Sequence, residues 1–176
     1  MQSEQILKSR IFSVERLTYA TASGQAMQRD VVRHPGSVAI VPILNDGRVC
    51  LIKNRRVSVE KTLIEIPAGT MEPPEPALAC ARRELIEETG YHAGSLKKLA
   101  SFFPAPGILD EEMHLFLATD LSAGEPAREA GEQIENYVVD LNEAKKMVFN
   151  GEIRDAKTIV GLLMLTQSEL EQKDAK

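Results

Sequence analysis

One stretch, residues 69–91 (GTMEPPEPALACARRELIEETGY), constrains the fold more than any other part of the chain. Its second half has the periodicity of an amphipathic helix that packs on a core through small residues. The apolar positions of this expected helix are Ala77, Leu78, Ala81 and Leu85. Pro76 is tolerated in a first helical turn, because the amide that it lacks would have no helical partner. Gly90 can end the helix in a left-handed conformation, so the stretch predicts a loop, a helix and a defined stop.

The opposite face of the expected helix carries a concentration of negative charge. Glu84, Glu87 and Glu88 fall at i, i+3 and i+4, so three carboxylates share one arc of the helix. Most glutamates on helices are simply solvated, but like charges this close destabilise a helix unless a cation neutralises them. Arg83 can reach Glu87, yet one guanidinium group cannot balance the whole set. Because carboxylate oxygens are hard ligands, the pattern favours a bound Mg²⁺ or Mn²⁺ over zinc.

These glutamates belong to a longer pattern of fixed spacing. The pattern runs Gly69, five residues, Glu75, seven residues, Arg83-Glu84-Leu85-x-Glu87-Glu88-x-Gly90 and an apolar residue. A chance match to every fixed position in a chain of this length has a frequency on the order of one in a million. An ordinary solvated helix face therefore does not explain this stretch.

Every fixed position of the pattern matches the Nudix box, so the chain resembles the Nudix hydrolases, which cleave a nucleoside diphosphate linked to another group. The resemblance implies that Glu84 and Glu88 bind the metal ions, that Glu87 assists, and that the backbone carbonyl of Ala68 is a further ligand. The implied cofactor is Mg²⁺ or Mn²⁺. The implied fold is the Nudix fold, an α/β/α sandwich around a mixed sheet.

Three segments outside the box resemble the ADP-ribose pyrophosphatase branch of that family. They are residues 31–39 (VVRHPGSVA), 63–69 (LIEIPAG) and 104–111 (PAPGILDE). The third is similar to the Ser-Pro-Gly-x-x-Asp-Glu loop of that branch, with Pro106 in the place of the proline by which ADP-ribose enzymes are recognised. It departs from that loop at Ala105, where the branch has serine, and at Leu109, which replaces a small polar residue. Enzymes for GDP-mannose and other nucleotide sugars have similar loops, so a nucleotide-sugar pyrophosphatase stays open as an alternative.

The resemblance also indicates which residues contact the substrate. The segment Asn54-Arg55-Arg56-Val57 stands where relatives have Gln-x-Arg-Pro. The guanidinium group of arginine can donate two parallel hydrogen bonds to phosphate oxygens. Two arginines at a strand end are equally typical of a pair that is simply exposed to solvent. The substrate-binding candidates are Arg55, Arg56, Glu65, Pro106 and Gly107. The products expected from ADP-ribose are AMP and ribose 5-phosphate.

The loop at residues 104–111 supplies the expected base. Hydrolysis of a diphosphate needs a group that orients the attacking water, and metal-bound glutamates are poor bases because the cation lowers their proton affinity. Glu111 matches the loop glutamate of the ADP-ribose enzymes, and Glu112 and Asp110 are neighbours that can substitute for it. With Glu87, Glu111 and Glu112 make up the expected catalytic set. The alternative for the loop is a solvated acidic turn.

The length of 176 residues suffices for one domain with a full hydrophobic core but is short for two domains that each have one. The net charge of −5 argues against nucleic acid or an anionic membrane as a partner. No apolar segment is typical of a secretion signal or long enough to span a bilayer, so a cytoplasmic location is expected.

The cysteines and histidines do not form a metal site. Cys50 and Cys80 lack metal-site spacing and are expected to be buried free thiols. His34, His92 and His114 are too scattered along the chain to form a ligand set.

Strands mixed with a few helices predict an α+β fold. Expected strands lie at residues 11–20 and 26–34, which form an N-terminal antiparallel hairpin, and at 37–44, 48–54, 96–103, 113–119 and 135–141. The strands at 37–44 and 48–54 are expected to pair through the turn Asn45-Asp46-Gly47. Helices are expected after the capping residues Asn142 and Asp155.

The expected organisation is an N-terminal hairpin at residues 1–35, a catalytic domain at 36–170 and a frayed tail at 171–176. In the ADP-ribose branch, N-terminal strands exchange between subunits, so the resemblance implies a homodimer. The alternative of another class is a non-catalytic sensor that binds ADP-ribose. Such proteins usually lose box glutamates, and this chain keeps all three.

Overall fold

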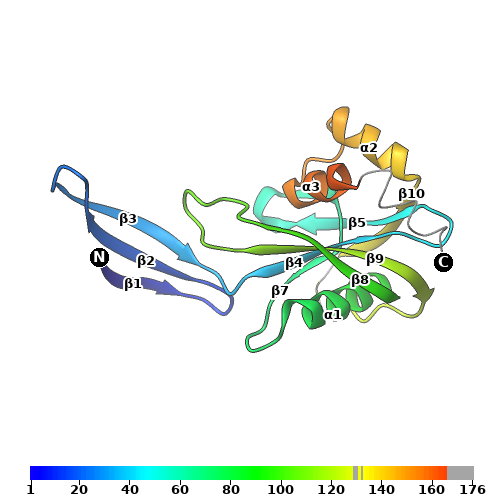
Figure 1. Cartoon of the computed structure of the whole chain (residues 1–176), viewed down its shortest axis with the longest axis horizontal. Helices are drawn as coiled ribbons and strands as arrows, with labels where there is room; N and C mark the ends of the chain where they lie inside the picture. Colours follow the sequence, from blue (N-terminus) through cyan, green and yellow to red (C-terminus); the bar gives the residue numbers. More distant parts are fainter. Residues whose placement is uncertain (129–130, 132, 166–176) are drawn as a thin grey trace.

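The computed structural model describes residues 1–128, 131 and 133–165. They form a central body of strands and helices, with a smaller sheet projecting from one end (Figure 1). The strands are β1 (Gln2–Lys8), β2 (Ser13–Ala20), β3 (Ala26–Arg33), β4 (Ser37–Pro42), β5 (Val49–Arg56), β6 (Lys61–Glu65), β7 (Ala68–Thr70), β8 (Tyr91–Phe102), β9 (Met113–Ala123) and β10 (Ile134–Val139). The helices are α1 (Ala77–Thr89), α2 (Leu141–Phe149) and α3 (Ala156–Met164), with a short 3₁₀ turn, η1 (Val57–Val59).

The body has the layered arrangement that the sequence predicts. Its strands form two sheets, ordered β7-β4-β9-β8 and β10-β5-β6. β4 and β9 run parallel, and the other neighbouring strands of both sheets are antiparallel. α1 covers one side of these strands, and α2 and α3 cover the other (Figure 1). The expected α/β/α sandwich around strands of mixed direction is confirmed.

β4 lies between two hydrophobic cores, because the side chains of a strand alternate between the faces of its sheet. Ala39 and Val41 belong to the core that α2 and α3 cover, whereas Val38 and Ile40 belong to the core that α1 covers. All four residues are completely buried. Both faces need apolar side chains, and the continuous run SVAIVP supplies them. The same strand is therefore the support on which α1 is positioned.

The predicted hairpin of residues 37–44 and 48–54 is wrong in its pairing. Gly47 does take the positive φ, +86°, that such a turn needs. Beyond a single bridge between Ile43 and Val49, however, β4 pairs with β7 and β9, and β5 pairs with β6 and β10. Both strands are buried on both faces and each needs two strand neighbours. An apolar run does not specify which neighbours those are.

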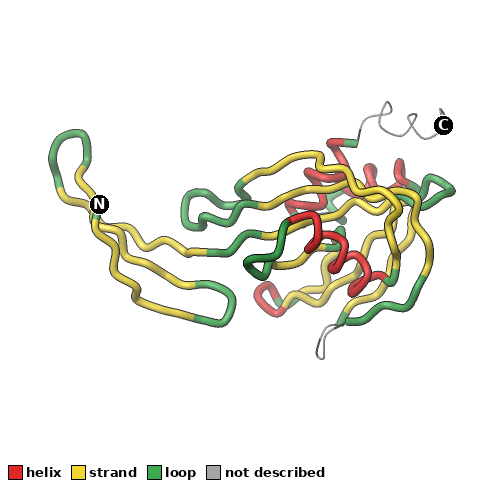
Figure 2. The backbone as a smooth tube through the Cα atoms, turned by 60° about the horizontal axis from the view of Figure 1, so that its bottom comes forward, coloured by secondary structure: helices red, strands yellow, loops and turns green. Residues whose placement is uncertain are grey.

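The N-terminal unit has three strands rather than the predicted two. β1, β2 and β3 form an antiparallel sheet that extends away from the body (Figures 1 and 2). Sequence reasoning misses β1, because its residues, QSEQILK, are mostly polar and all exposed. The sheet is joined to the body through the end of β3, where Val32 bridges to Leu109 and Arg33 pairs with Asp110 at 3.0 Å.

α1 begins and ends close to where the sequence predicts. Gly90 follows it in the left-handed conformation with φ of +79°, and Pro76 stands at the N-cap, one position before the first turn. One member of the predicted apolar face is wrong, since Leu78 is 48% exposed. It lies in the first turn, before the buried part of the helix begins at Cys80.

Of the two predicted capping residues, one is confirmed. Asp155 caps α3, because its side chain accepts the Thr158 N–H at 3.0 Å. α2 is capped by Asp140 instead of Asn142, since the Asp140 carboxylate accepts the backbone N–H of Asn142 at 2.9 Å. The predicted tail at 171–176 lies outside the described residues. None of the helices in the described ranges is long and apolar enough to cross a bilayer.

Candidate active site

A cavity of about 600 Å³ opens beside α1, where the end of β5 and the residues of β7 come together. Its wall contains the predicted metal ligands Ala68, Glu84 and Glu88. It also contains Glu87, which is predicted to assist, and one predicted substrate contact, Arg56. Arg10, in the turn between β1 and β2, reaches the same cavity, so the N-terminal sheet contributes to it. The fold thus gathers into one space side chains that lie far apart in the sequence.

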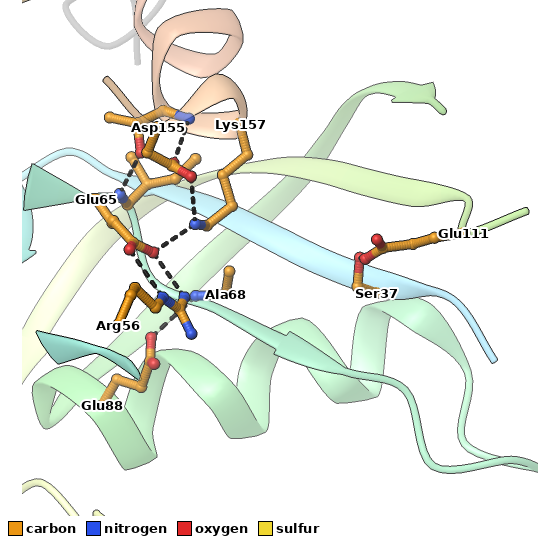
Figure 3. Close-up of polar contacts among 10 residues, drawn as sticks. Ser37, Arg56, Glu65, Ala68, Glu88, Glu111, Asp155 and Lys157 are labelled. Atoms are coloured by element: carbon orange, nitrogen blue, oxygen red, sulfur yellow. Dashed lines mark hydrogen bonds and ion pairs between the residues drawn. The ribbon is translucent and has the colours of Figure 1, made fainter. Parts of the chain in front are cut away.

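Glu88 is more deeply buried than the other two box glutamates, with 4% of its surface exposed. It lies in the last turn of α1, and its carboxylate accepts the backbone N–H of Ala68 at 2.9 Å (Figure 3). A buried carboxylate requires such a partner, because desolvation without one is costly. This bond connects the end of α1 to the start of β7 and fixes Glu88 at the wall of the cavity.

Glu84 lies directly against Gly69. A Cβ atom at position 69 would come within 1.8 Å of the carboxylate carbon of Glu84, so any other residue would force this side chain to move. Gly69 is not among the residues with positive φ. The glycine that begins the box therefore makes room for the carboxylate in this position and is not there for its own backbone angles.

Arg83 neutralises part of the acidic cluster. Its guanidinium group donates two hydrogen bonds to Glu75, at 3.0 and 3.1 Å, one to Glu84 at 2.7 Å and one to Glu87 at 2.9 Å. Its hydrogen bonds to Glu75 and the neighbouring carboxylates raise the pKa of Arg83, and the same contact lowers the pKa of Glu75. Arg83 thus forms ion pairs with three carboxylates, whereas the sequence indicates a pair with Glu87 alone.

The donor atoms at this cavity are of the chemical type that binds a hard divalent cation. The donors are carboxylate and carbonyl oxygens, which Mg²⁺ and Mn²⁺ prefer, and the space at Gly69 lets a carboxylate lie at the wall. Within the ranges that the structure describes, no three acidic, histidine or cysteine side chains converge into a ready-made ligand set. Arg83 donates to one oxygen of Glu84 and to one oxygen of Glu87, so it competes with a cation for these two oxygens.

A buried chain of charged groups lies beside the cavity and fixes Arg56. The guanidinium group donates to both oxygens of Glu65, at 2.6 and 2.8 Å, and the Lys157 ammonium group donates to the same carboxylate at 2.5 Å (Figure 3). Lys157 also pairs with Asp155 at 3.0 Å, and Asp155 accepts the hydroxyl of Thr158. Burial raises the pKa of Glu65, but the bonds and charges of Arg56 and Lys157 outweigh it and hold this pKa below its ordinary value.

This chain of charges gives Glu65 a supporting role instead of a direct substrate contact, and it includes Lys157, which is not among the predicted site residues. Glu65 is completely buried and does not line the cavity, so it orients Arg56 from behind. Sequence reasoning misses Lys157, since lysines are rarely buried, and it gives Asp155 only the role of a cap. Lys157 is 8% exposed, and it reaches a carboxylate 92 residues away in the chain. No local pattern signals a contact of that separation.

The two arginines at the end of β5 point to opposite faces, as the two-residue period of a strand requires. Arg56 lines the cavity, whereas Arg55 is exposed and lies outside its lining. Asn54 shares the face of Arg56 and lines the cavity too, although it is not among the predicted substrate contacts. The alternation along β5 is the signal that separates these three residues.

The predicted catalytic loop lies apart from the cavity lining. Glu111 accepts a hydrogen bond of 2.5 Å from the Ser37 hydroxyl, and Figure 3 shows this pair away from the cluster around Arg56. Glu112 is about half exposed. Neither carboxylate, nor Pro106 or Gly107, lines the cavity. The structure therefore brings the box glutamates together with one another but not with the loop.

The loop is nevertheless anchored close to the rim of the cavity. Ser37 begins β4 and pairs across the sheet with Thr70 of β7, which lines the cavity. The backbone N–H of Ser37 donates to the carbonyl of Glu112 at 3.1 Å. Asp110 secures the other side of the turn through Arg33. Glu111 is thus one strand away from the cavity wall.

Neither cysteine lines the cavity, although the Sγ atom of Cys80 accepts a hydrogen bond from Arg83 at 3.3 Å. Both are buried free thiols, as predicted, and burial raises the pKa of Cys50 and of Cys80 to about 12. A raised pKa disfavours the thiolate at neutral pH, as is typical of structural cysteines.

A comparison with protein families decides to which one this chain belongs. The family model of the NUDIX domain matches residues 33–160. The chain belongs to the Nudix family. The predicted class of enzyme is confirmed as well, so the protein is a Nudix hydrolase. Members of this family generally use divalent metal ions and act on small nucleoside diphosphate substrates.

Three curated relatives are similar to this Nudix hydrolase over nearly its whole length. The ADP-ribose pyrophosphatase of Bacillus subtilis (strain 168) is 38% identical over 171 residues, which cover 96% of this chain and 92% of the relative. The methanol dehydrogenase activator of Bacillus methanolicus is 34% identical with the same coverage of both chains. The GDP-mannose pyrophosphatase of Citrobacter koseri is 34% identical over 185 residues, which cover 95% of this chain and 94% of the relative.

A solved structure confirms the fold. The crystal structure of an ADP compounds hydrolase superposes with a TM-score of 0.84 and covers 98% of this chain and 94% of its own. The two sequences are 23% identical, so this likeness concerns the Nudix fold alone.

Proposed function

We propose that this Nudix hydrolase cleaves the diphosphate bond of ADP-ribose to AMP and ribose 5-phosphate, with Mg²⁺ or Mn²⁺ as the cofactor. The observation that carries the proposal is the cavity of about 600 Å³ in which Glu84, Glu87 and Glu88 face Arg56. The 38% identity to an ADP-ribose pyrophosphatase supports the choice of substrate. We place the enzyme in the cytoplasm, with no membrane or nucleic-acid partner.

The residues of the cavity divide the work between the cation and the substrate. Glu84, Glu88 and the carbonyl of Ala68 would hold the metal ions, and Glu87 would assist. The bound cation would neutralise charge on the diphosphate oxygens. Arg56 binds a phosphate: Glu65 takes two of the five N–H donors of its guanidinium group, which leaves three for a ligand.

Glu111 is the proposed group that orients the attacking water. In the position described, its carboxylate is bonded to Ser37 at the rim, so it must leave this hydroxyl to act. Its place on a loop suits that exchange, since the loop belongs to no helix or strand. Glu112 and Asp110 are adjacent carboxylates, and Asp110 is occupied by Arg33.

Replacement of Glu111 by glutamine is expected to lower kcat by about a hundredfold, because a positioned base contributes about 10²–10⁴ to a rate. KM should change little, since Glu111 does not line the cavity that binds the substrate. The measurement is steady-state hydrolysis of ADP-ribose by Glu111→Gln and by Glu112→Gln. A larger loss in the second variant would move the role to Glu112, and full activity in the first would remove it from Glu111.

The substrate is tested directly with a panel of ADP-ribose, GDP-mannose, NADH, diadenosine polyphosphates and deoxynucleoside triphosphates. With Mg²⁺ or Mn²⁺ present, ADP-ribose should have the highest kcat/KM and give AMP. The GDP-mannose pyrophosphatase relative supports a nucleotide-sugar substrate as the second candidate, and faster cleavage of GDP-mannose would establish it. Binding of ADP-ribose without turnover of any compound would favour a sensor.

We also propose that the protein is a homodimer built through its N-terminal sheet. β1 to β3 expose apolar side chains on a sheet that no described helix covers, and three strands without a covered face are marginally stable alone. Analytical ultracentrifugation should give twice the chain mass of 19.4 kDa. The double variant Ile6→Asp/Leu7→Asp should sediment as a monomer with its circular dichroism retained. A wild-type protein that is monomeric at micromolar concentration would contradict the proposal.

A further inference from the structure

The side chain of Asn54 is buried and polar, yet it makes no hydrogen bond to any residue that the structure describes. Asn54 is 8% exposed and lies two residues before the end of β5. Across the described residues (1–128, 131 and 133–165), its amide has no hydrogen-bond or ion-pair partner. Buried amides are normally bonded, because burial without a partner is costly. A side chain of this kind at the wall of a cavity is typical of a group that binds a ligand.

The amide of Asn54 is open to the cavity. No side-chain nitrogen or oxygen that is sealed from solvent lacks a partner in the part of the chain that is described. Since the amide of Asn54 has no partner, its polar atoms must reach accessible space, and the space that Asn54 lines is the cavity. The backbone of Asn54 is already paired on both sides, with Leu63 of β6 and Ile134 of β10. The side chain is therefore the group that β5 offers to a ligand here.

The surroundings indicate which kind of ligand group the amide would bind. Asn54 shares the inward face of β5 with Arg56, and the acidic residues Glu84, Glu87 and Glu88 line the same cavity. An anionic ligand needs donors on the side of Arg56, and an amide supplies two N–H donors without a charge. Unlike a lysine in this place, it would not compete with Arg56 for Glu65. A neutral donor beside an arginine fits a non-bridging phosphoryl oxygen.

We propose that Asn54 is a further substrate-binding residue, whose side-chain amide donates a hydrogen bond to a phosphoryl oxygen of the bound diphosphate beside Arg56. The inference rests on the proposed function only in taking a nucleoside diphosphate as the ligand. It does not depend on which sugar or base the diphosphate carries. The same contact is therefore made with ADP-ribose and with GDP-mannose.

Asn54→Leu removes the amide and keeps the number and branching of the side-chain heavy atoms. The kcat/KM for each diphosphate that the wild type hydrolyses should fall by about 10- to 100-fold, the effect of losing a hydrogen bond to a charged group. The affinity for the α,β-methylene analogue of ADP-ribose, measured by calorimetry with Mg²⁺, should fall by a similar factor. The melting temperature should change little, because the amide faces the open cavity and the substitution breaks no hydrogen bond within the described residues. Asn54→Asp should bind more weakly still, since it adds a fifth carboxylate to the cavity lining, which repels the diphosphate.

Asn45→Leu is the matched control. The amide of Asn45 donates to the Leu121 carbonyl at 3.1 Å and lies outside the cavity lining, so this variant should lose stability and keep its kinetics. All measurements are made well below the lowest melting temperature, so that folded proteins are compared. An Asn54→Leu protein that binds the analogue as tightly as the wild type overturns the inference, whatever its melting temperature.

Failure of the proposed function is distinguishable from failure of this inference. If the wild type hydrolyses no diphosphate, the proposed activity is wrong, and weaker binding of the analogue or of inorganic pyrophosphate by Asn54→Leu still supports the contact. If the wild type is active and Asn54→Leu matches it on every substrate, the activity stands and the role of Asn54 is wrong.

Discussion

Replacement of Glu88 by glutamine is expected to lower kcat by about a hundredfold or more and to leave the protein folded. The carboxylate of Glu88 lies at the cavity wall with 4% of its surface exposed, and a glutamine there keeps the shape but not the charge. A neutral amide is a poor ligand for a hard cation in comparison with a carboxylate. Steady-state turnover and calorimetric titration with Mg²⁺ and Mn²⁺ measure the two consequences.

The fold should tolerate this change for three physical reasons. The amide oxygen of a glutamine can still accept the N–H of Ala68, which Glu88 accepts at 2.9 Å. A negative charge in the last turn of a helix is unfavourable to the helix dipole, and here it is removed. Repulsion by Glu84 at i−4 is removed too. The melting temperature should therefore equal or exceed that of the wild type.

Glu143→Gln is the control for this experiment. Glu143 lies on α2 and pairs with Lys146 on the surface, so its replacement should change neither turnover nor metal uptake. If Glu88→Gln takes up metal with wild-type affinity and turns over at the wild-type rate, the assignment of the metal site to Glu88 is wrong.

The parts of the site that the sequence predicts are those that depend on short separations along the chain. The spacing of Glu84, Glu87 and Glu88 places them on one arc of a helix, and the helix lies where the pattern puts it. The need for Gly69 next to a carboxylate is also implicit in the pattern. Its cause becomes visible only in the structure, where Glu84 fills the place of a Cβ atom.

The parts that the sequence does not predict depend on contacts between distant segments. The pairing of β5 with β10 instead of β4 is one example, because a buried apolar strand accepts any buried neighbour. The contact of Lys157 with Glu65 is another, since it crosses 92 residues and runs against the usual exposure of lysine. The position of Glu111 on Ser37 is a third, and a loop motif does not indicate what its carboxylate bonds to.

Replacement of Lys157 by methionine is expected to lower the free energy of unfolding by about 1–3 kcal/mol, the cost of removing one of the two charged partners of a buried carboxylate. The Lys157 side chain is 9% exposed and that of Glu65 is 1% exposed, so water cannot take the place of the lost ammonium group. Arg56 alone then remains to compensate Glu65. Its guanidinium group would be drawn more strongly toward Glu65, which weakens its hold on a phosphate. Urea unfolding at neutral pH measures the first effect, and KM measures the second.

The double variant Glu65→Gln/Lys157→Met should lose less stability than the sum of the two single changes, because it leaves neither charge alone.

The contribution of Glu65 to the free energy of unfolding also depends on pH in a defined direction. The pKa of Glu65 is lowered in the folded protein by Arg56 and Lys157 against the effect of burial. Its contribution is therefore present above the unfolded-state pKa of about 4.3 and is lost as the pH falls through the lower folded-state pKa. The difference in stability between the wild type and Glu65→Gln should shrink over that acidic range.

Lys146→Met provides the matched comparison for Lys157→Met. Lys146 pairs with Glu143 on the surface, where its side chain is 73% exposed, and water can solvate both charges once the pair is broken. The same chemical change should therefore have a small effect at position 146 and a large one at position 157. Equal effects at the two positions would mean that the buried pair does not hold Glu65 and Arg56 in place. In that case Arg56 would owe its orientation to β5 and to its own bonds with Glu65.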